Sequence, residues 1–277
     1  DPFCHFALVA SDEALADAGL DTESFSDEDR ARPGVVFGSG IGGMKLFQDQ
    51  VVEYAAAGPR RLSPFFVPMM IIDMAPGQIS MRHNLRGPNY ATVSACATSN
   101  NAIGDAFLLI KNGLAETMVA GGTDASITEV GLGGFGNMKA LSTRNDDPQR
   151  ASRPFDVDRD GFVMAEGAGA IILESLEHAQ ARGARIYAEL VGLGMSADAH
   201  HISAPHPEGL AELKSRGHRT EMYRSKSWDE FTNAGVEMDM QGGVYSKYIP
   251  ELISEGRVKE TRLDTYVKRV LEMKYRL

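Results

Sequence analysis

The chain has 277 residues, with 28 Lys or Arg against 38 Asp or Glu, so its formal net charge is −10. This length fits one large or two ordinary domains, and the acidity, without any basic tract, argues against a nucleic-acid partner. Two cysteines are too few for a disulfide scaffold and fit a reducing compartment, so we expect a cytoplasmic protein. No apolar run reaches the roughly 18 residues of a membrane span, so we expect neither a membrane partner nor a signal peptide.

The first 57 residues predict a helix, a loop, a strand and a second helix. Residues 6–18 have helical periodicity, with Gly19 as the C-cap. The predicted apolar face of this helix consists of Phe6, Val9, Ala10 and Ala14. The chain enters the helix without an initiating Met, which indicates an incomplete N-terminus. Residues 34–37 predict a buried strand, and a helix to about Ala57 follows the glycine-rich turn Gly38–Gly43.

The turn Gly38–Gly43 has two interpretations. A glycine-rich turn after a strand can cradle a phosphate, but this spacing is not that of a dinucleotide-binding unit and no P-loop lysine follows. Close packing of the backbone against a neighbouring segment is the alternative, and the spacing favours it. Residues 59–68 contain Arg60 and Arg61 beside Phe65 and Phe66, which fits either an anion-contacting edge next to an apolar pocket or a solvated turn over core aromatics.

Cys96 lies in the stretch of the chain that carries the most chemical information. Residues 91–95 form a short β-type run, and Ile103, Phe107 and Ile110 mark one face of a helix that starts near Asn100. This places Cys96 at a strand-to-helix turn, where free backbone N–H groups and the helix dipole favour thiolate over thiol. The cysteine is therefore either a nucleophile or a buried structural residue, and the local context does not separate the two.

The remaining elements continue the alternation of strands and helices. We expect a helix at 71–85, a strand at 117–120 running into Gly121-Gly122, and a glycine-rich loop at 131–143 that carries Phe135. A turn-rich segment at 152–161, a buried strand at 165–174, a helix at 175–182 and a strand at 188–192 follow. This order predicts an α/β fold with a largely buried sheet. The composition changes after about Gly209, and the chain ends in an amphipathic helix that includes Leu263, Tyr266, Val267, Val270 and Leu271.

Residues 1–209 resemble the N-terminal half of the type II elongating β-ketoacyl-acyl-carrier-protein synthases. The matching stretches are GSGIGG at 38–43, SPFFVP at 63–68, LRGP at 85–88, SACATS around Cys96, VAGGTDAS at 119–126, and the long segments 133–163 and 182–201. The resemblance implies a thiolase-like half-fold of the layered αβαβα type. It also favours the nucleophile interpretation of Cys96, because the family's acyl-accepting cysteine occupies this position.

The resemblance implies further roles by position. Cys96 would hold the growing acyl chain as a thioester, and its own N–H would supply one oxyanion donor. Ile41, Phe66 and Phe135 match positions that border the acyl pocket. Arg60, Arg61 and Lys139 match the basic edge that meets an acyl carrier protein bearing an acyl or malonyl thioester. A homodimer is implied, and no cofactor or metal is expected.

The sequence departs from this family in its second half. The family's two catalytic histidines lie in an HGT-type motif and just before an NSFGFGG-type motif, and this chain contains neither motif. We therefore expect decarboxylative condensation with malonyl-acyl carrier protein to be impaired. The group of His200, His201 and His206 does not replace these residues, and adjacent side chains on a strand point apart, which disfavours a zinc site there.

The tail at 210–277 resembles the end of the (β/α)₈ barrel domain of glycoside hydrolase family 3. A gapless extension of the match puts His206 where that family has its nucleophilic aspartate. A retaining hydrolase needs two carboxylates at a fixed separation, and the tail offers no recognised one. The alternatives to acyl transfer are therefore a β-glucosidase-type fragment or a non-catalytic chimeric chain, with the junction between about Ala204 and Leu210.

Overall fold

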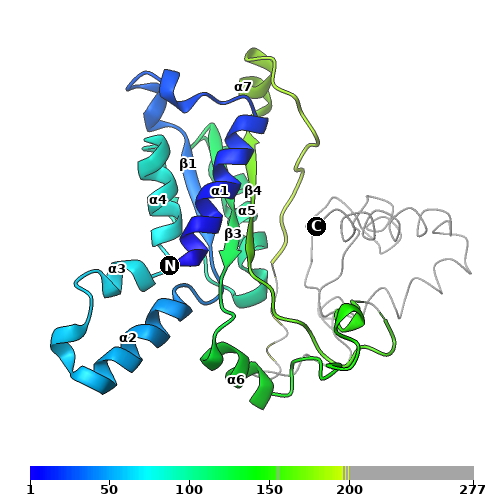
Figure 1. Ribbon diagram of the computed structural model, residues 1–277. Coiled ribbons are helices and arrows are strands. Elements are labelled where there is room, and N and C mark those ends of the chain that lie inside the picture. Colours follow the sequence, from blue (N-terminus) through cyan, green and yellow to red (C-terminus); the bar gives the residue numbers. More distant parts are fainter. Residues whose placement is uncertain (155, 196, 198, 200–277) are drawn as a thin grey trace, which may run out of the picture. The chain divides into compact units, whose positions relative to one another are not determined.

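The computed structural model describes residues 1–154, 156–195, 197 and 199. The predicted tail at 210–277, the predicted boundary at 209, the histidines from His200 to His206 and the C-terminal amphipathic helix lie outside the described residues. The chain divides into two units, Asp1–Arg153 with Arg159–Ala188, and Pro154–Asp158 with Glu189–Leu277. All elements described below belong to the first unit (Figure 1). No helix in the described part of the chain is long and apolar enough to cross a membrane.

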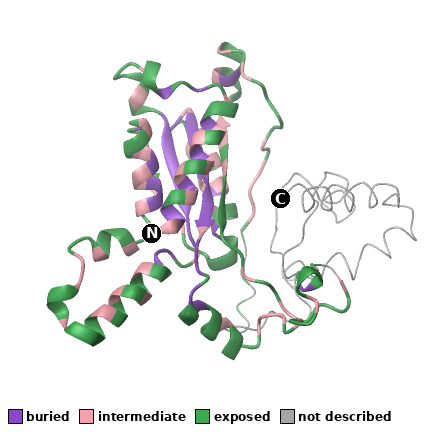
Figure 2. Cartoon of the chain, viewed as in Figure 1, coloured by how far each residue is buried: buried purple, intermediate pink, exposed green. Residues whose placement is uncertain are grey.

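A four-stranded sheet forms the centre of the first unit. Its strands are β1 (Gly34–Gly38), β2 (Asn89–Tyr90), β3 (Thr117–Asp124) and β4 (Gly167–Glu174), in the order β2-β1-β3-β4. β1 pairs in parallel with β2 and β3, whereas β4 is antiparallel to β3. All of β1 is buried, as its short apolar run predicts (Figure 2). The predicted α/β fold with a central sheet is confirmed.

Helices cover both faces of the sheet. α1 (Pro2–Asp17) and α4 (Met74–His83) pack on one face, and α5 (Thr98–Lys111) packs on the other. The other helices are α2 (Met44–Ala57), α3 (Phe66–Met70), α6 (Glu129–Asn137) and α7 (Leu176–Ala181). Side chains alternate along β1, so Val35 and Phe37 join a core with α1 and α4, while Val36 joins a core with α5. The three layers place the carboxyl ends of β1 and β3 beside the start of α5.

Three sequence predictions were wrong in detail. α1 buries Phe3, Ala7, Ser11 and Leu15, whereas Val9, from the predicted face, is exposed. The helix begins earlier than predicted, at Pro2, where Asp1 accepts a hydrogen bond from the amide of Phe3, so the buried run starts outside the predicted segment. Residues 91–95 are not a strand, since only Asn89 and Tyr90 pair with β1. Residues 188–192 also form no strand.

Two further corrections concern glycine-rich segments. Most of the predicted loop at 131–143 is helix α6, because the hydroxyl of Thr128 caps it at the amide of Gly131 and Gln48 of α2 accepts from Val130. These contacts outweigh the low helix propensity of glycine. β4 exists as predicted but is not buried: it is the edge strand, and Ile171 is exposed. The sequence shows the apolar run but not which strand lies at the edge.

Candidate active site

Cys96 lies on a 3₁₀ turn, Ala95–Ala97, between β2 and α5. The residue is exposed, so its interpretation as a buried structural cysteine is wrong. Ala95 has a φ of 51°, a left-handed conformation that residues with a Cβ rarely adopt. The strand predicted before Cys96 is replaced by irregular chain and a 3₁₀ turn. The cysteine lies just before α5, as expected.

Next to Cys96, the amide of Ala97 donates to the carbonyl of Ser94, and the amide of Thr98 donates to the carbonyl of Ala95. The N-cap residue is Ala97, whose side chain makes no capping hydrogen bond. Among the described residues, none accepts a hydrogen bond from the amide of Cys96. Unpaired N–H groups and the positive end of a helix dipole stabilise a nearby anion, whether a thiolate or the oxyanion of an acyl-transfer intermediate.

Hydrogen bonds to α5 hold the chain segment that precedes Cys96. The amide of Ser94 donates to Oγ1 of Thr98 at 2.9 Å, and Oγ1 of Thr92 donates to the carbonyl of Thr98 at 3.1 Å. The hydroxyl of Ser94 donates to Oδ1 of Asn101 at 2.6 Å. The cluster of Ser and Thr around Cys96 therefore fixes the chain segment from which the thiol projects.

The loop Gly38–Gly43 packs directly against this segment. A methyl group added at Gly38 would lie 2.2 Å from Cγ2 of Thr98 and 2.5 Å from the carbonyl oxygen of Thr92. The close-packing interpretation of the glycines is therefore confirmed. The phosphate interpretation is disfavoured, since the loop amides that an anion would need already donate to a carboxylate of the protein.

That carboxylate belongs to Asp124, at the end of β3, and sequence reasoning missed it. It accepts hydrogen bonds from Oγ of Ser39 at 2.9 Å, the amide of Gly40 at 3.2 Å and the amide of Ile41 at 3.3 Å. The sequence signal was an acidic residue a few positions beyond the predicted strand at 117–120, and the structure makes it the last residue of β3, which runs parallel to β1. Carboxyl ends of parallel strands share one edge of a sheet, so Asp124 was bound to lie near the glycine loop.

The three predicted pocket residues lie on different elements. Ile41 is on the glycine loop and is 39% exposed. Phe66, in α3, stacks on Phe47 at a centroid distance of 6.2 Å. Phe135, in α6, makes an edge-to-face contact with Phe162 at 5.3 Å. The aromatic contacts of the described residues thus join Phe66 and Phe135 to other rings, and only Ile41 is placed in the loop that contacts the Cys96 turn.

The three predicted basic residues are exposed. Arg60 and Arg61 form the 3₁₀ turn after α2, and Nε of Arg61 pairs with Glu53 at 2.9 Å. Lys139 follows α6 with a φ of 56°. Gln48 links α2 to α6, because its side chain donates to the Glu129 carboxylate and accepts from the amide of Val130. The two arginines therefore follow α2 and Lys139 follows α6, and Gln48 joins these two helices.

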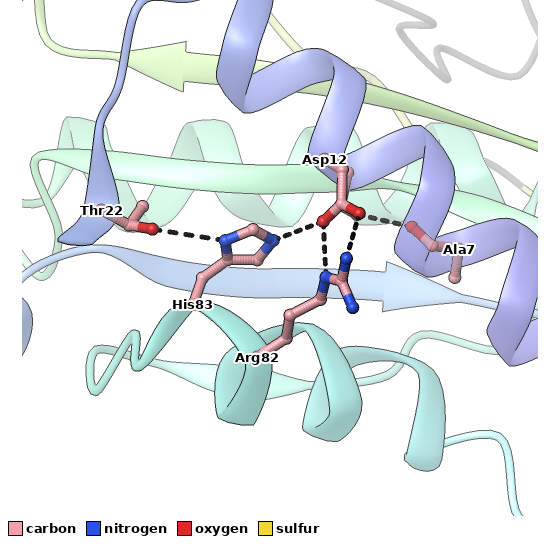
Figure 3. A network of polar contacts seen from close by, with 6 residues as sticks. Ala7, Asp12, Thr22, Arg82 and His83 are labelled. Atoms are coloured by element: carbon pink, nitrogen blue, oxygen red, sulfur yellow. Dashed lines mark hydrogen bonds and ion pairs between the residues drawn. The ribbon is translucent and has the colours of Figure 1, made fainter.

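The described histidines are surface residues or have structural partners. His5 is exposed. Nε2 of His83 lies 2.9 Å from Asp12, which also accepts two hydrogen bonds from Arg82, and Nδ1 of His83 lies 3.3 Å from the Thr22 hydroxyl (Figure 3). His178 binds Glu174 through Nδ1 at 2.7 Å. Within the described ranges no group of three or more His, Cys, Asp or Glu is arranged to hold a metal ion.

Comparisons with solved structures define the class of protein. A β-ketoacyl synthase from Burkholderia phymatum superposes with a TM-score of 0.68 at 35% identity, over 74% of this chain and 50% of that one. The ketosynthase in the AntDE:AntF complex gives 0.72 at 30% identity, over 78% and 54%. These neighbours are thiolase-like ketosynthases, so the predicted thiolase-like half-fold is confirmed for the matched part. The predicted barrel fragment stays a prediction.

Sequence comparisons give the family. The N-terminal domain of β-ketoacyl synthases matches residues 1–179. The 3-oxoacyl-[acyl-carrier-protein] synthase 2 of Rhizobium meliloti is 56% identical over 210 residues, which is 76% of this chain and 49% of that protein. The Synechocystis protein of the same name is 52% identical over 215 residues, 78% of this chain and 51% of that protein. The chain belongs to the β-ketoacyl synthase family, and it spans about half the length of these curated relatives.

Proposed function

We propose that this chain provides the acyl-accepting half of a 3-oxoacyl-acyl-carrier-protein synthase in fatty-acid elongation, with Cys96 as the nucleophile. The observation that carries the proposal is the position of Cys96. It is an exposed cysteine on a turn at the uncapped start of α5. It lies in a chain 56% identical to such a synthase.

The proposed reaction is a transthioesterification. The thiolate of Cys96 attacks the carbonyl carbon of an acyl thioester, and a carbon–sulfur bond to Cys96 forms. The carbonyl oxygen becomes an oxyanion, which the backbone N–H of Cys96 stabilises. The intermediate collapses as the bond to the donor sulfur breaks, and the released thiolate takes up a proton from solvent. The product is an acyl-Cys96 thioester and a free donor thiol.

The partner that we propose is an acyl carrier protein, whose acyl thioester is the donor to Cys96 and whose malonyl thioester is the extender in condensation. Arg60, Arg61 and Lys139 would contact its acidic surface, and all three are exposed. Ile41, Phe66 and Phe135 would border the acyl chain. One of the similar solved structures contains a ketosynthase in complex with its acyl carrier protein, which supports this type of partner. A homodimer is proposed from the family resemblance alone.

Condensation is the step that we expect to be impaired. The family's two catalytic histidine motifs do not occur in this sequence. His83 and His178 are engaged by Asp12 and Glu174, so neither is free to replace them. The chain should therefore accept an acyl group on Cys96 and fail to extend it with malonyl-acyl carrier protein.

Intact-mass spectrometry of the full chain after incubation with a fatty-acyl-loaded acyl carrier protein tests the proposal. A gain of one acyl mass in the wild type, absent in Cys96→Ala, is expected. A gain that persists in Cys96→Ala, or no gain at all, contradicts it.

Hydrolysis of an aryl β-glucoside that survives Cys96→Ala and is lost with the tail would favour the hydrolase alternative instead. Elution only as large aggregates in size-exclusion chromatography would favour the non-catalytic alternative.

A further inference from the structure

The carboxylate of Asp124 is bound almost entirely by the glycine loop. Its two oxygens accept from Oγ of Ser39 and from the amides of Gly40 and Ile41. Oγ of Ser39, which is buried, in turn accepts from the amide of Gly42 at 2.9 Å. The amides of Gly40 and Ile41 are thus bound directly to the Asp124 side chain at the end of β3, and the amide of Gly42 is bound to it through the Ser39 hydroxyl.

The loop transmits this constraint to the residue before Cys96. A methyl group added at Gly40 would lie 3.3 Å from Oδ2 of Asp124 and 3.4 Å from the carbonyl oxygen of Ala95. Gly40 therefore lies beside both the carboxylate, which accepts from its amide, and the Ala95 carbonyl of the Cys96 turn. Any outward movement of the loop would remove this support from the Ala95 carbonyl.

Ala95 needs such support because of its conformation. A φ of 51° is unfavourable for a residue with a Cβ and persists only where the surroundings impose it. On one side the turn is tied to α5 by the hydrogen bond from Ser94 to Thr98. On the other side Gly40, which Asp124 holds, lies beside the carbonyl of Ala95.

We propose that Asp124 is a positioning residue for Cys96. It holds the glycine loop beside Ala95, keeps Ala95 in the left-handed conformation, and so keeps the thiol of Cys96 at the N-terminal end of α5. It acts through Gly40 and Ala95 and does not touch the acyl group. This role rests on the proposed function of Cys96 as the nucleophile, but its test needs no acyl donor.

The test measures how fast iodoacetamide alkylates Cys96 in the full chain, by intact mass, with Cys96→Ser as the background. Asp124→Asn replaces one acceptor oxygen with an NH₂ group that faces a backbone donor. We expect alkylation about tenfold slower, as Ala95 leaves its strained conformation. Ala95→Gly alone should change the rate less than about twofold, because glycine adopts positive φ readily. The double variant Asp124→Asn/Ala95→Gly should recover to within about threefold of the wild type.

This rescue separates positioning from a general structural role. If Asp124 only stabilised the fold, Ala95→Gly would not restore the rate, and the two substitutions would act independently. Such independence, or an unchanged rate in Asp124→Asn, overturns the proposal. Asp29→Asn is the matched control. Asp29 also accepts from a serine hydroxyl and amide, those of Ser26, but precedes β1 at the opposite end of the strand, so the rate should not change.

A second variant covers the case in which circular dichroism shows that Asp124→Asn does not fold. Ser39→Ala leaves the bonds from Gly40 and Ile41 to Asp124 in place and removes only the hydroxyl link. It should slow alkylation about threefold and be rescued by Ala95→Gly, and no rescue counts against the proposal. Normal alkylation without acyl transfer would contradict the proposed function and leave the role of Asp124 intact.

Discussion

The two ends of the sheet are held together by different chemistry. Where β1 and β3 begin, charged side chains join neighbouring elements. Asp12 of α1 binds Arg82 and His83 of α4 (Figure 3), and Glu174 of β4 binds His178 of α7 and Arg182. Where the same strands end, glycines, small hydroxyls and backbone amides pack around Asp124. The first arrangement fixes helices to each other and to a strand, and the second fixes the backbone next to the proposed nucleophile. Stability and reactivity should therefore respond to different substitutions.

Gly38→Ala should have the largest effect on stability. The new methyl group would overlap Cγ2 of Thr98 and the backbone of Thr92, so we expect a loss of about 3 kcal/mol in the free energy of unfolding. Urea denaturation measures it. Gly133→Ala is the matched control, since no atom lies within 4 Å of its added methyl group in α6, and it should stabilise by about 0.5–1 kcal/mol. Equal effects of the two substitutions would refute the close packing of the loop.

Asp12→Ala should have a smaller effect, confined to the other end of the sheet. Asp12 and Arg82 are 33% and 54% exposed, so their ion pair contributes little, while His83, 15% exposed, loses a hydrogen-bond partner. We expect a loss of about 1 kcal/mol in urea denaturation. The rate of Cys96 alkylation by iodoacetamide should stay at the wild-type value. A slower rate would show that the two ends are not independent.

Part of this difference between the two ends of the sheet could be predicted from the sequence. The buried β1, the helix to Ala57 and the position of Cys96 follow from short-range patterns and from motifs that surround the cysteine. The partners of Asp124 could not be predicted, because its hydrogen bonds join residues more than 80 positions apart and depend on the register of β1 with β3. The helix α6 was missed because its cap and its contact with Gln48 outweigh glycine propensity. The exposure of β4 depends on strand order, which periodicity does not encode.

The contribution of Glu174 to stability is expected to depend on pH. Burial by itself raises the pKa of this carboxyl, but hydrogen bonds and charges from Arg182 and His178 outweigh it and hold the pKa below its ordinary value of 4.5. A carboxyl with a lowered folded-state pKa stabilises the protein fully above the unfolded value. This contribution is lost as the pH falls through the folded value. Wild-type stability should thus fall more steeply than that of Glu174→Gln below about pH 4.5, in urea titrations at graded pH. Parallel curves would contradict the assignment.

The acyl-accepting role of Cys96 is the central claim, and intact-mass spectrometry with an acyl-loaded carrier protein tests it most directly. Burial raises the pKa of the other cysteine, Cys4, to about 11, so that thiol should not compete. The account predicts one acyl mass on the wild type, mapped to Cys96 by peptide digestion and absent in Cys96→Ala. An acyl group on Cys4, or an unmodified Cys96 in a chain that alkylates normally with iodoacetamide, would contradict it.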